Sequence, residues 1–174
     1  MDEARASLAR TPAVLRALLE GLPEAWLDAC AEGPGTWSPR EVACHLADLE
    51  EDAWIGRLRW ILERGTAAPL PGVERERFRA RYAGASLARV LDDFEDRRAR
   101  NLRELAELRL DGRALEARGL HATLGEVTAS QLLGTWVVHD LTHLAQIVRV
   151  LAAGRRNEVG PWVEFLSVLR PRST

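Results

Sequence analysis

The sequence contains no lysine, only two cysteines and no long uninterrupted apolar stretch. All 24 basic residues are arginine, and a compositional bias of the source genome is the simplest explanation. Cys30 and Cys44 fit neither the disulfide framework of a small secreted domain nor a Cys-x-x-Cys metal motif. No segment reaches the roughly 20 apolar residues that a transmembrane helix requires. The sequence therefore predicts neither a disulfide-stabilised nor a membrane-spanning protein.

Charge and targeting signals are also sparse. The 26 acidic and 24 basic residues give a formal net charge of −2, so nothing here favours nucleic acid or an anionic membrane as a partner. The first ten residues, MDEARASLAR, are charged and lack the apolar core of a signal peptide. We therefore predict a cytoplasmic protein.

The 174 residues are 47% hydrophobic and 29% charged, which is typical of a globular protein, and we predict a single domain over residues 1–174. Four long segments carry apolar residues at helical spacing, at 2–20, 38–62, 86–108 and 123–153. No segment shows the alternation of a strand. The predicted fold is all-α, an antiparallel four-helix bundle with short accessory helices near 23–30, 74–82 and 162–169. The last of these is expected to cover one end of the core, and residues 109–122 to form an irregular connection.

Two helix starts carry a specific signature. Ser38 and Glu41 form a capping box, with Pro39 at the first helical position. Thr123 and Glu126 have the same spacing ahead of the fourth long segment. These patterns predict where the second and fourth long helices begin.

His139 and His143 stand four residues apart in the fourth long segment, TWVVHDLTHLAQIVRVLAAG. On a helix this spacing puts both imidazoles on one face, within reach of a single ion. A metal site needs more than two ligands, and His45, early in the second long helix, is the best candidate for the third. Such pairs also arise by chance, and a lone histidine is commonly a core residue. The combination is stronger because three of only four histidines fall on inward-leaning faces, whereas His121 lies in a predicted loop and is interpreted as a surface residue.

Several polar side chains could assist this site. Asp48 and Asp52 project within the same arc as His45, and could orient a ligand, accept a proton or supply an oxygen ligand. Thr135 shares the face of His139 and could orient a substrate. Asp140 projects about a quarter turn away and is a weaker candidate.

Other conspicuous residues have simpler structural interpretations. Cys44 projects about 100° from the neighbouring histidine, so a core thiol is the simplest interpretation. Trp136 is expected in the core, and could also line a pocket near the histidines. The arginines at 75, 77, 79 and 81 alternate along a short charged segment and are interpreted as a solvated surface.

Two motifs, WSPREVACHL with His45 and HDLTHLAQ with His139, His143 and Gln146, make the sequence resemble the DinB/YfiT-like family. The helix pattern extends this resemblance over nearly the whole chain. The family has a four-helix-bundle fold, and the resemblance implies a divalent metal held by His45, His139 and His143 with water in the remaining positions. Zinc or nickel is expected first, with iron or manganese as alternatives. Relatives include thiol-dependent isomerases, S-transferases that use low-molecular-weight thiols, and proteins described as hydrolases; homodimers are common among them.

These observations predict a metal-dependent enzyme that activates a thiol or a water, for transfer to or hydrolysis of a small molecule in detoxification or stress defence. No residue beyond the metal ligands is assigned a catalytic role. Two alternatives stay open: a non-catalytic bundle that binds a metal or a small ligand, and a structural bundle without metal. Nothing in the sequence selects the metal, the thiol or the substrate.

Overall fold

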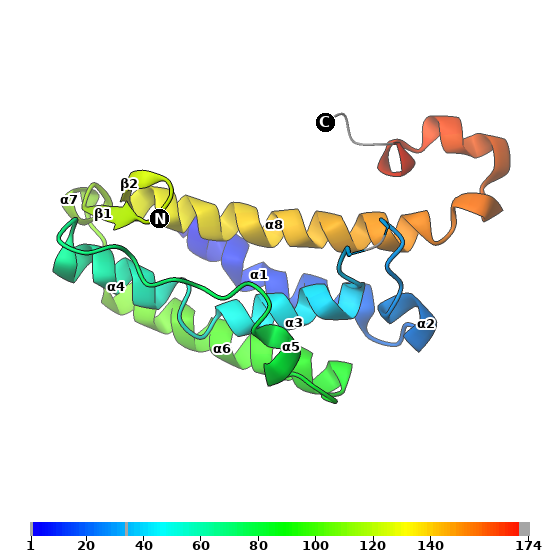
Figure 1. Ribbon diagram of the computed structural model, residues 1–174, viewed down its shortest axis with the longest axis horizontal. Coiled ribbons are helices and arrows are strands. Elements are labelled where there is room, and N and C mark those ends of the chain that lie inside the picture. The colour runs from blue at the N-terminus through cyan, green and yellow to red at the C-terminus, as the bar shows by residue number, and fades with distance from the viewer. Residues whose placement is uncertain (1, 34, 171–174) are drawn as a thin grey trace.

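The computed structural model describes residues 2–33 and 35–170 and is mainly helical (Figure 1). The bundle consists of α1 (Asp2–Leu19), α3 (Pro39–Leu49) with its continuation α4 (Ile55–Arg64), α6 (Leu87–Glu107) and α8 (Ala129–Ala153). Helices α1 and α3 each pack against both α6 and α8. The predicted four-helix bundle is confirmed. No helix in the described part of the chain is long and apolar enough to cross a membrane.

The helices run in two directions. In Figure 1, α3, α4 and α6 run one way, antiparallel to α1 and α8. Because α4 and α6 run the same way, the chain must return along the bundle between them, and residues 65–86 form this crossover. It includes the short helix α5 (Phe78–Arg81), which packs on α3. The crossover therefore lies beside α3, where it can contribute side chains to a site between α3 and α8.

The predicted start of the second long helix is confirmed. The Ser38 hydroxyl accepts a hydrogen bond from the Glu41 amide, and the Glu41 carboxylate accepts one from the Ser38 amide. The Ser86 hydroxyl also caps α6, by accepting a hydrogen bond from the amide of Arg89. These caps are local contacts three residues apart, which is why the sequence reveals them.

The second long helix is not continuous, contrary to prediction. It ends at Leu49, and α4 begins at Ile55 after a turn. The backbone carbonyl of Glu50 accepts a hydrogen bond from the Asn101 side chain at 2.7 Å, and the Glu50 carboxylate accepts others from Arg98. The turn is therefore stabilised by residues of α6, and no glycine or proline signals it in the sequence.

The fourth long helix begins five residues later than predicted. Its N-cap is Thr128, and Gln131 completes a capping box there. Thr123 and Glu126 lie instead in an antiparallel hairpin of β1 (Arg118–His121) and β2 (Gly125–Thr128), which follows the short helix α7 (Gly112–Leu115). Glu126 pairs across this hairpin with Arg118 at 2.6 Å.

This hairpin also corrects the prediction that the chain has no strands and an irregular segment over 109–122. Gly125 adopts a φ of +76°, which a left-handed turn requires and glycine accepts without strain. Gly119 lies close to Ile61 of α4. A Cβ atom added to Gly119 would lie 2.7 Å from Cγ1 of Ile61, so a larger residue does not fit without a shift. Leu70 of the crossover donates its amide to the carbonyl of Leu120 at 2.7 Å. The hairpin thus fastens the crossover to the end of the bundle.

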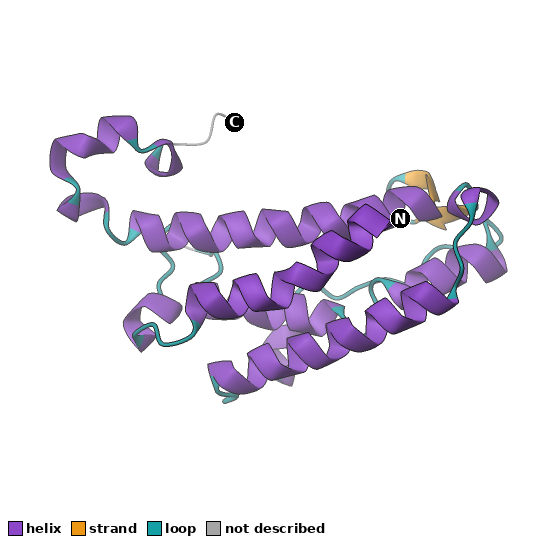
Figure 2. Cartoon of the chain, turned by 180° about the vertical axis from the view of Figure 1, so that it is seen from behind, coloured by secondary structure: helices purple, strands orange, loops and turns teal. Residues whose placement is uncertain are grey.

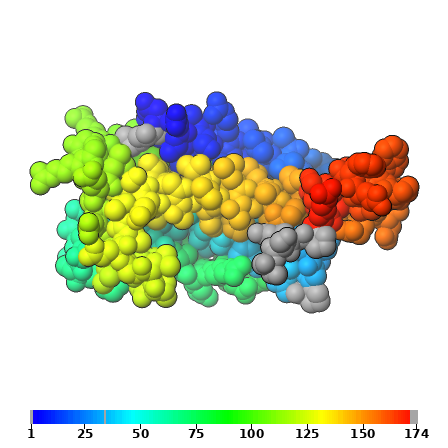
Figure 3. Space-filling view, turned by 90° about the horizontal axis from the view of Figure 1, so that it is seen from above, coloured from blue at the N-terminus to red at the C-terminus, as the bar shows by residue number. Residues whose placement is uncertain are grey.

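The short segments at the two ends of the sequence differ in packing. The predicted helix near 23–30 is present as α2 (Glu24–Leu27). The C-terminal segment forms three 3₁₀ turns, η1 (Arg156–Glu158), η2 (Gly160–Phe165) and η3 (Ser167–Leu169). Trp162 and Phe165 are 69% and 76% exposed, and Leu169 is buried. Figures 2 and 3 show this segment at the C-terminal end of α8, and η3 packs back on that helix. The predicted single helix over residues 162–169 is replaced by 3₁₀ turns.

Candidate metal centre

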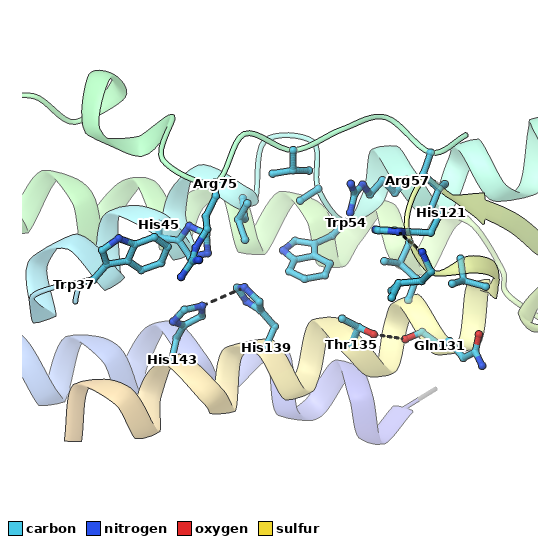
Figure 4. Close-up of a pocket in the computed structure, with 17 residues that line it drawn as sticks. Trp37, His45, Trp54, Arg57, Arg75, His121, Gln131, Thr135, His139 and His143 are labelled. Atoms are coloured by element: carbon cyan, nitrogen blue, oxygen red, sulfur yellow. Dashed lines mark hydrogen bonds between the residues drawn. The ribbon is translucent and has the colours of Figure 1, made fainter. Parts of the chain in front are cut away.

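The structure brings the three predicted ligand residues together. His45 of α3 faces His139 and His143 of α8, and one nitrogen atom of each lies within 4.8 Å of the other two (Figure 4). The ring centroids of His45 lie 5.4 Å and 4.9 Å from those of His139 and His143. This arrangement requires the antiparallel packing of α3 on α8, because the pairs are about 100 residues apart in sequence.

The two histidines of α8 point their Nε2 atoms at each other, 3.2 Å apart. The Gln146 side-chain oxygen can only accept a hydrogen bond, so Nδ1 of His143, at 3.0 Å, donates to it. In the neutral ring this leaves Nε2 of His143 as a lone pair directed at His139. Either the Nε2 proton of His139 or a metal ion therefore lies between the two atoms. Ligand nitrogens around a tetrahedral zinc ion would be about 3.3 Å apart, so the spacing fits a metal.

All three histidines are held in the neutral form. Burial and the nearby His143 lower the pKa of His45 to about 4. Burial, with His143 and His45 as further causes, lowers the pKa of His139 to about 3. Burial also lowers the pKa of His143, and the hydrogen bond with Gln146 acts in the opposite direction. Among the described residues, neither Nδ1 of His45 nor Nδ1 of His139 has a hydrogen-bond partner. Neutral imidazoles that converge in this way are a donor set that suits a divalent metal.

Tryptophans form the walls around the histidines. Trp37, just before the start of α3, packs on His45 with ring centroids 4.5 Å apart and stacks on His143 at 6.0 Å. Trp54, at the turn before α4, meets His139 edge to face at 5.2 Å. Trp136 stacks on Trp54 but is fully buried and does not line the pocket, contrary to one expectation. These contacts restrict the rotation of the imidazoles.

The histidines lie at one end of a cavity of about 360 Å³. In Figure 4 its other end lies near the hairpin, where Arg57 and His121 are found. His121 was interpreted as an ordinary surface residue, and its place in the wall corrects that interpretation. The wall between the ends is largely apolar, and its members are Trp54, Leu49, Ala53, Leu70, Val73, Leu124, Val127 and Leu132.

The aspartates proposed to assist the site do not reach it. Asp48 is buried and its carboxylate pairs with Arg77 and Arg81, at 3.0 Å and 2.6 Å. Asp52, displaced by the turn after α3, pairs with Arg77 at 2.8 Å. Neither carboxylate lines the pocket. Both face the crossover, so the prediction that they help to bind a ligand is wrong.

The arginines of the crossover are not a uniformly solvated surface either. Arg77 and Arg81 fix α5 to α3 through Asp48, and Arg79 pairs with Glu41. Arg75 lines the pocket and lies over the Trp37 ring, with its guanidinium carbon 4.6 Å from the ring centroid. Acidic partners on another helix distinguish the three paired arginines, and periodicity alone does not reveal such partners.

A buried ionic cluster lies beside the histidines. Arg98 pairs with Glu50 and with Asp140, the neighbour of His139, at 2.9 Å and 2.7 Å. Thr11, Asn101 and Trp136 donate further hydrogen bonds to the two carboxylates. We call these six residues the Arg98 network. Asp140, a weaker candidate for the site, belongs to this network and not to the pocket wall.

A sequence signal for the network was present but not used. In α6 the buried residues 91, 94, 98, 101 and 105 follow helical spacing, and two of them, Arg98 and Asn101, are polar. Polar residues on an apolar stripe indicate a buried polar contact, because unpaired burial is costly. Cys44, in contrast, is buried as predicted, and burial raises the pKa of its thiol to about 11. A core thiol of that kind is unreactive.

Comparison with known proteins agrees with this architecture. No curated protein matches the sequence significantly. Among solved structures, YfiT from Bacillus subtilis, described as a probable metal-dependent hydrolase with an unusual four-helix bundle topology, superimposes with a TM-score of 0.74. The match has 21% identity and covers 90% of this chain and 86% of that one. TT2238, described as a four-helix bundle protein, has a TM-score of 0.58 and 29% identity, covering 84% and 96%.

The decisive match is to a family model. The model of the DinB superfamily matches residues 7–147, a range that includes all three histidines and most of the bundle. The resemblance inferred from the two histidine motifs is thereby confirmed. This chain belongs to the DinB superfamily.

Proposed function

We propose that the protein is a divalent-metal-dependent enzyme that activates a thiol or a water toward a small molecule held in the pocket. The observation that supports this most is the convergence of three neutral histidines, His45, His139 and His143, at one end of an open cavity. When bound there, a divalent ion supplies a Lewis acid that lowers the pKa of a thiol or a water. An open cavity beside the histidines leaves room for a reactant, as a catalytic site requires.

The surrounding residues would prepare the three histidines for this role. Gln146 holds the Nδ1 proton of His143, which leaves its Nε2 as the ligand atom. Trp37 and Trp54 pack on the imidazoles and keep water away from their buried faces. The hydroxyl of Thr135 lies in the pocket wall, where its oxygen can accept a hydrogen bond from a reactant.

The composition of the wall favours a thiol as the nucleophile. No aspartate or glutamate is found among the described residues that line the pocket, so no carboxylate is placed to remove a proton. A free thiol has a pKa of about 8.5, so a bound metal has to lower that pKa only a little for a thiolate to form at neutral pH without such a base. We therefore propose S-transfer to an electrophilic small molecule as the first reaction to test.

Hydrolysis is the second candidate. It draws support from the description of the structural relative YfiT as a probable metal-dependent hydrolase. The apolar wall suits a small, largely apolar ester or amide equally well. Both reactions use the same three histidines, so one set of variants tests both.

The first measurement is the metal content of purified protein by elemental analysis after incubation with zinc or nickel. The parent should hold about one ion per chain. His45→Gln, His139→Gln and His143→Gln should each lose most of it. His121→Gln is the matched control, because His121 lines the same pocket but stands apart from the three. Its metal content should equal that of the parent.

Activity separates the remaining alternatives. Loaded parent protein is assayed for transfer of glutathione or cysteine to 1-chloro-2,4-dinitrobenzene and for hydrolysis of p-nitrophenyl acetate, against His139→Gln. Rates above the variant in either assay support the proposal and identify the nucleophile. Metal binding without any rate difference would favour a non-catalytic binding bundle. An absence of metal from the parent would leave the structural bundle.

A further inference from the structure

The charges of the pocket wall differ from those of the whole protein. The chain has 26 acidic and 24 basic residues, yet no acidic residue is found among the described residues lining the pocket. Two arginines, Arg57 and Arg75, do line it. A cavity with fixed positive charge and no compensating carboxylate attracts anions, and its apolar walls strengthen that attraction. The wall is therefore complementary to a negatively charged ligand.

Arg75 is the arginine that lies beside the histidines. Figure 4 shows its side chain descending from the crossover beside His45. Its guanidinium carbon lies 4.6 Å from the centroid of the Trp37 ring, and Trp37 also packs on His45 and His143. The Arg75 charge is one cause of the lowered pKa values of both histidines, which is consistent with this proximity. Arg75 therefore lies where the reactive end of a ligand would be.

The hydrogen bonds of the two arginines also differ. Arg57 donates from Nε and Nη2 to the carbonyl of Pro71, at 3.0 Å and 2.7 Å. Among the described residues, the guanidinium of Arg75 has no hydrogen-bonded or acidic partner, whereas Arg77, Arg79 and Arg81 all have one. A guanidinium stacked on an aromatic ring keeps its N–H groups free in the plane, in a geometry that suits a carboxylate. Arg75 is thus the free anion-binding group of the pocket.

We propose that the pocket takes a small amphipathic carboxylate, and that Arg75 binds its charge beside the three histidines while the apolar wall holds its body. Arg75 is thereby a specificity-determining residue. This inference rests on the proposed function only in taking this pocket as the substrate site. It concerns whichever reactant carries the carboxylate, and it does not depend on the nucleophile.

The test uses octanoate, octanamide and octylamine as probes of equal chain length and different charge. Their binding is measured by isothermal titration calorimetry, with protein tryptophan fluorescence as a second signal because Trp37 and Trp54 line the cavity. The parent should bind octanoate at least about tenfold more tightly than octanamide, since a charge-assisted hydrogen-bonded pair has this effect. Octylamine should bind most weakly.

Three variants assign the charge to one residue. Arg75→Gln should bind octanoate no better than octanamide, and Arg75→Lys should retain part of the preference. Arg79→Gln is the matched control, since it removes an arginine of the same segment that points away from the pocket. It should bind as the parent does. Arg57→Gln should lose less of the preference than Arg75→Gln, because the Arg57 guanidinium already donates to the carbonyl of Pro71. The inference is overturned if octanoate shows no saturable binding, if Arg75→Gln leaves the preference intact, or if Arg57→Gln removes it instead.

Each titration is repeated with metal-free and zinc-loaded protein, so that the two proposals can fail separately. Loss of octanoate preference in metal-free Arg75→Gln would support this inference even if zinc never bound and the proposed function failed. A zinc-loaded, active protein that ignores the Arg75 substitution would retain the proposed function and overturn this inference.

Discussion

The Arg98 network and the three histidines are two polar clusters that lie where α8 packs against neighbouring helices. Their hydrogen bonding differs. All five N–H groups of Arg98 have acceptors, in Glu50, Asp140 and the carbonyl of Leu8. The histidines instead leave Nδ1 of His45 and of His139 without partners among the described residues. A satisfied cluster stabilises one packing arrangement, whereas an unsatisfied one is suited to a ligand.

The two clusters are also adjacent and complementary in charge. Asp140 follows His139 directly, and the network carries one arginine against two carboxylates. Burial raises the pKa of Glu50, and the Arg98 charge opposes that change. With both carboxylates ionised the network has a net charge of −1, which favours a cation at the nearby histidines. Asp140 accordingly acts to raise the pKa of His143.

The largest expected effect comes from breaking the network. Arg98→Met leaves Glu50 and Asp140 buried without their cation, and should lower the free energy of unfolding by about 3–5 kcal/mol. Urea denaturation followed by circular dichroism measures it. Arg100→Met, on the exposed face of the same helix, should change stability by less than about 0.5 kcal/mol.

A companion variant tests the cause of that loss. Replacing Glu50 and Asp140 by leucine together with Arg98→Met should recover part of the stability, because no unpaired charge is then buried. A loss below about 1 kcal/mol in Arg98→Met alone would show that the network is not what holds the helices in register.

The next effect is the response of the metal-free histidines to pH. Their folded pKa values of about 4 for His45 and about 3 for His139 lie below the ordinary 6.5, so the unfolded chain binds more protons in acid. The contribution of these two histidines to the free energy of unfolding is therefore fully present above pH 6.5 and is lost as pH falls toward 4. Each of the two histidines should contribute a loss of about 2 kcal/mol between pH 7 and pH 5.

Urea unfolding of EDTA-treated protein at both pH values measures this loss. His139→Gln should reduce the pH dependence by the share of one histidine, and His121→Gln should leave it unchanged. An equal pH dependence in His139→Gln and the parent would contradict the neutral buried state of His139. The Arg98 network is common to all three proteins, so its own titration cancels from the comparison.

A smaller effect is expected at Gln146, whose side-chain oxygen accepts a hydrogen bond from Nδ1 of His143. Gln146→Leu removes the acceptor for the Nδ1 proton of His143 and should weaken zinc affinity by about 10–100-fold. Competition with a chromogenic chelator measures it. Gln146→Glu keeps an acceptor and should retain most of the affinity. If the leucine variant bound zinc as tightly as the parent, the orienting role would be excluded.

The smallest effect is expected at Asp48, which belongs to neither cluster. Asp48→Asn keeps an acceptor for Arg77 and Arg81 but removes the charge, and should cost about 1 kcal/mol of stability. Zinc affinity should stay within about twofold of the parent, because the carboxylate faces the crossover. A large loss of zinc affinity would return Asp48 to the site from which its contacts exclude it.

The parts that could be predicted from sequence depend on contacts within one helix or one turn. The Ser38–Glu41 cap, the Ser86 cap, the apolar stripes and the pairing of His139 with His143 all involve residues three or four apart. Helical geometry alone brings such residues together. The helical bundle and the histidine motifs follow from them.

Only the tertiary structure decided the rest, because it depends on residues far apart in sequence. The turn after Leu49 exists because Asn101 and Arg98 of α6 bind Glu50, and no local signal marks it. The same packing directs Asp48 away from His45 and toward the crossover. The path of that crossover places Arg75 at the pocket, and not among the solvated arginines. Partners about 30 to 50 residues apart are chosen by packing, which periodicity does not encode.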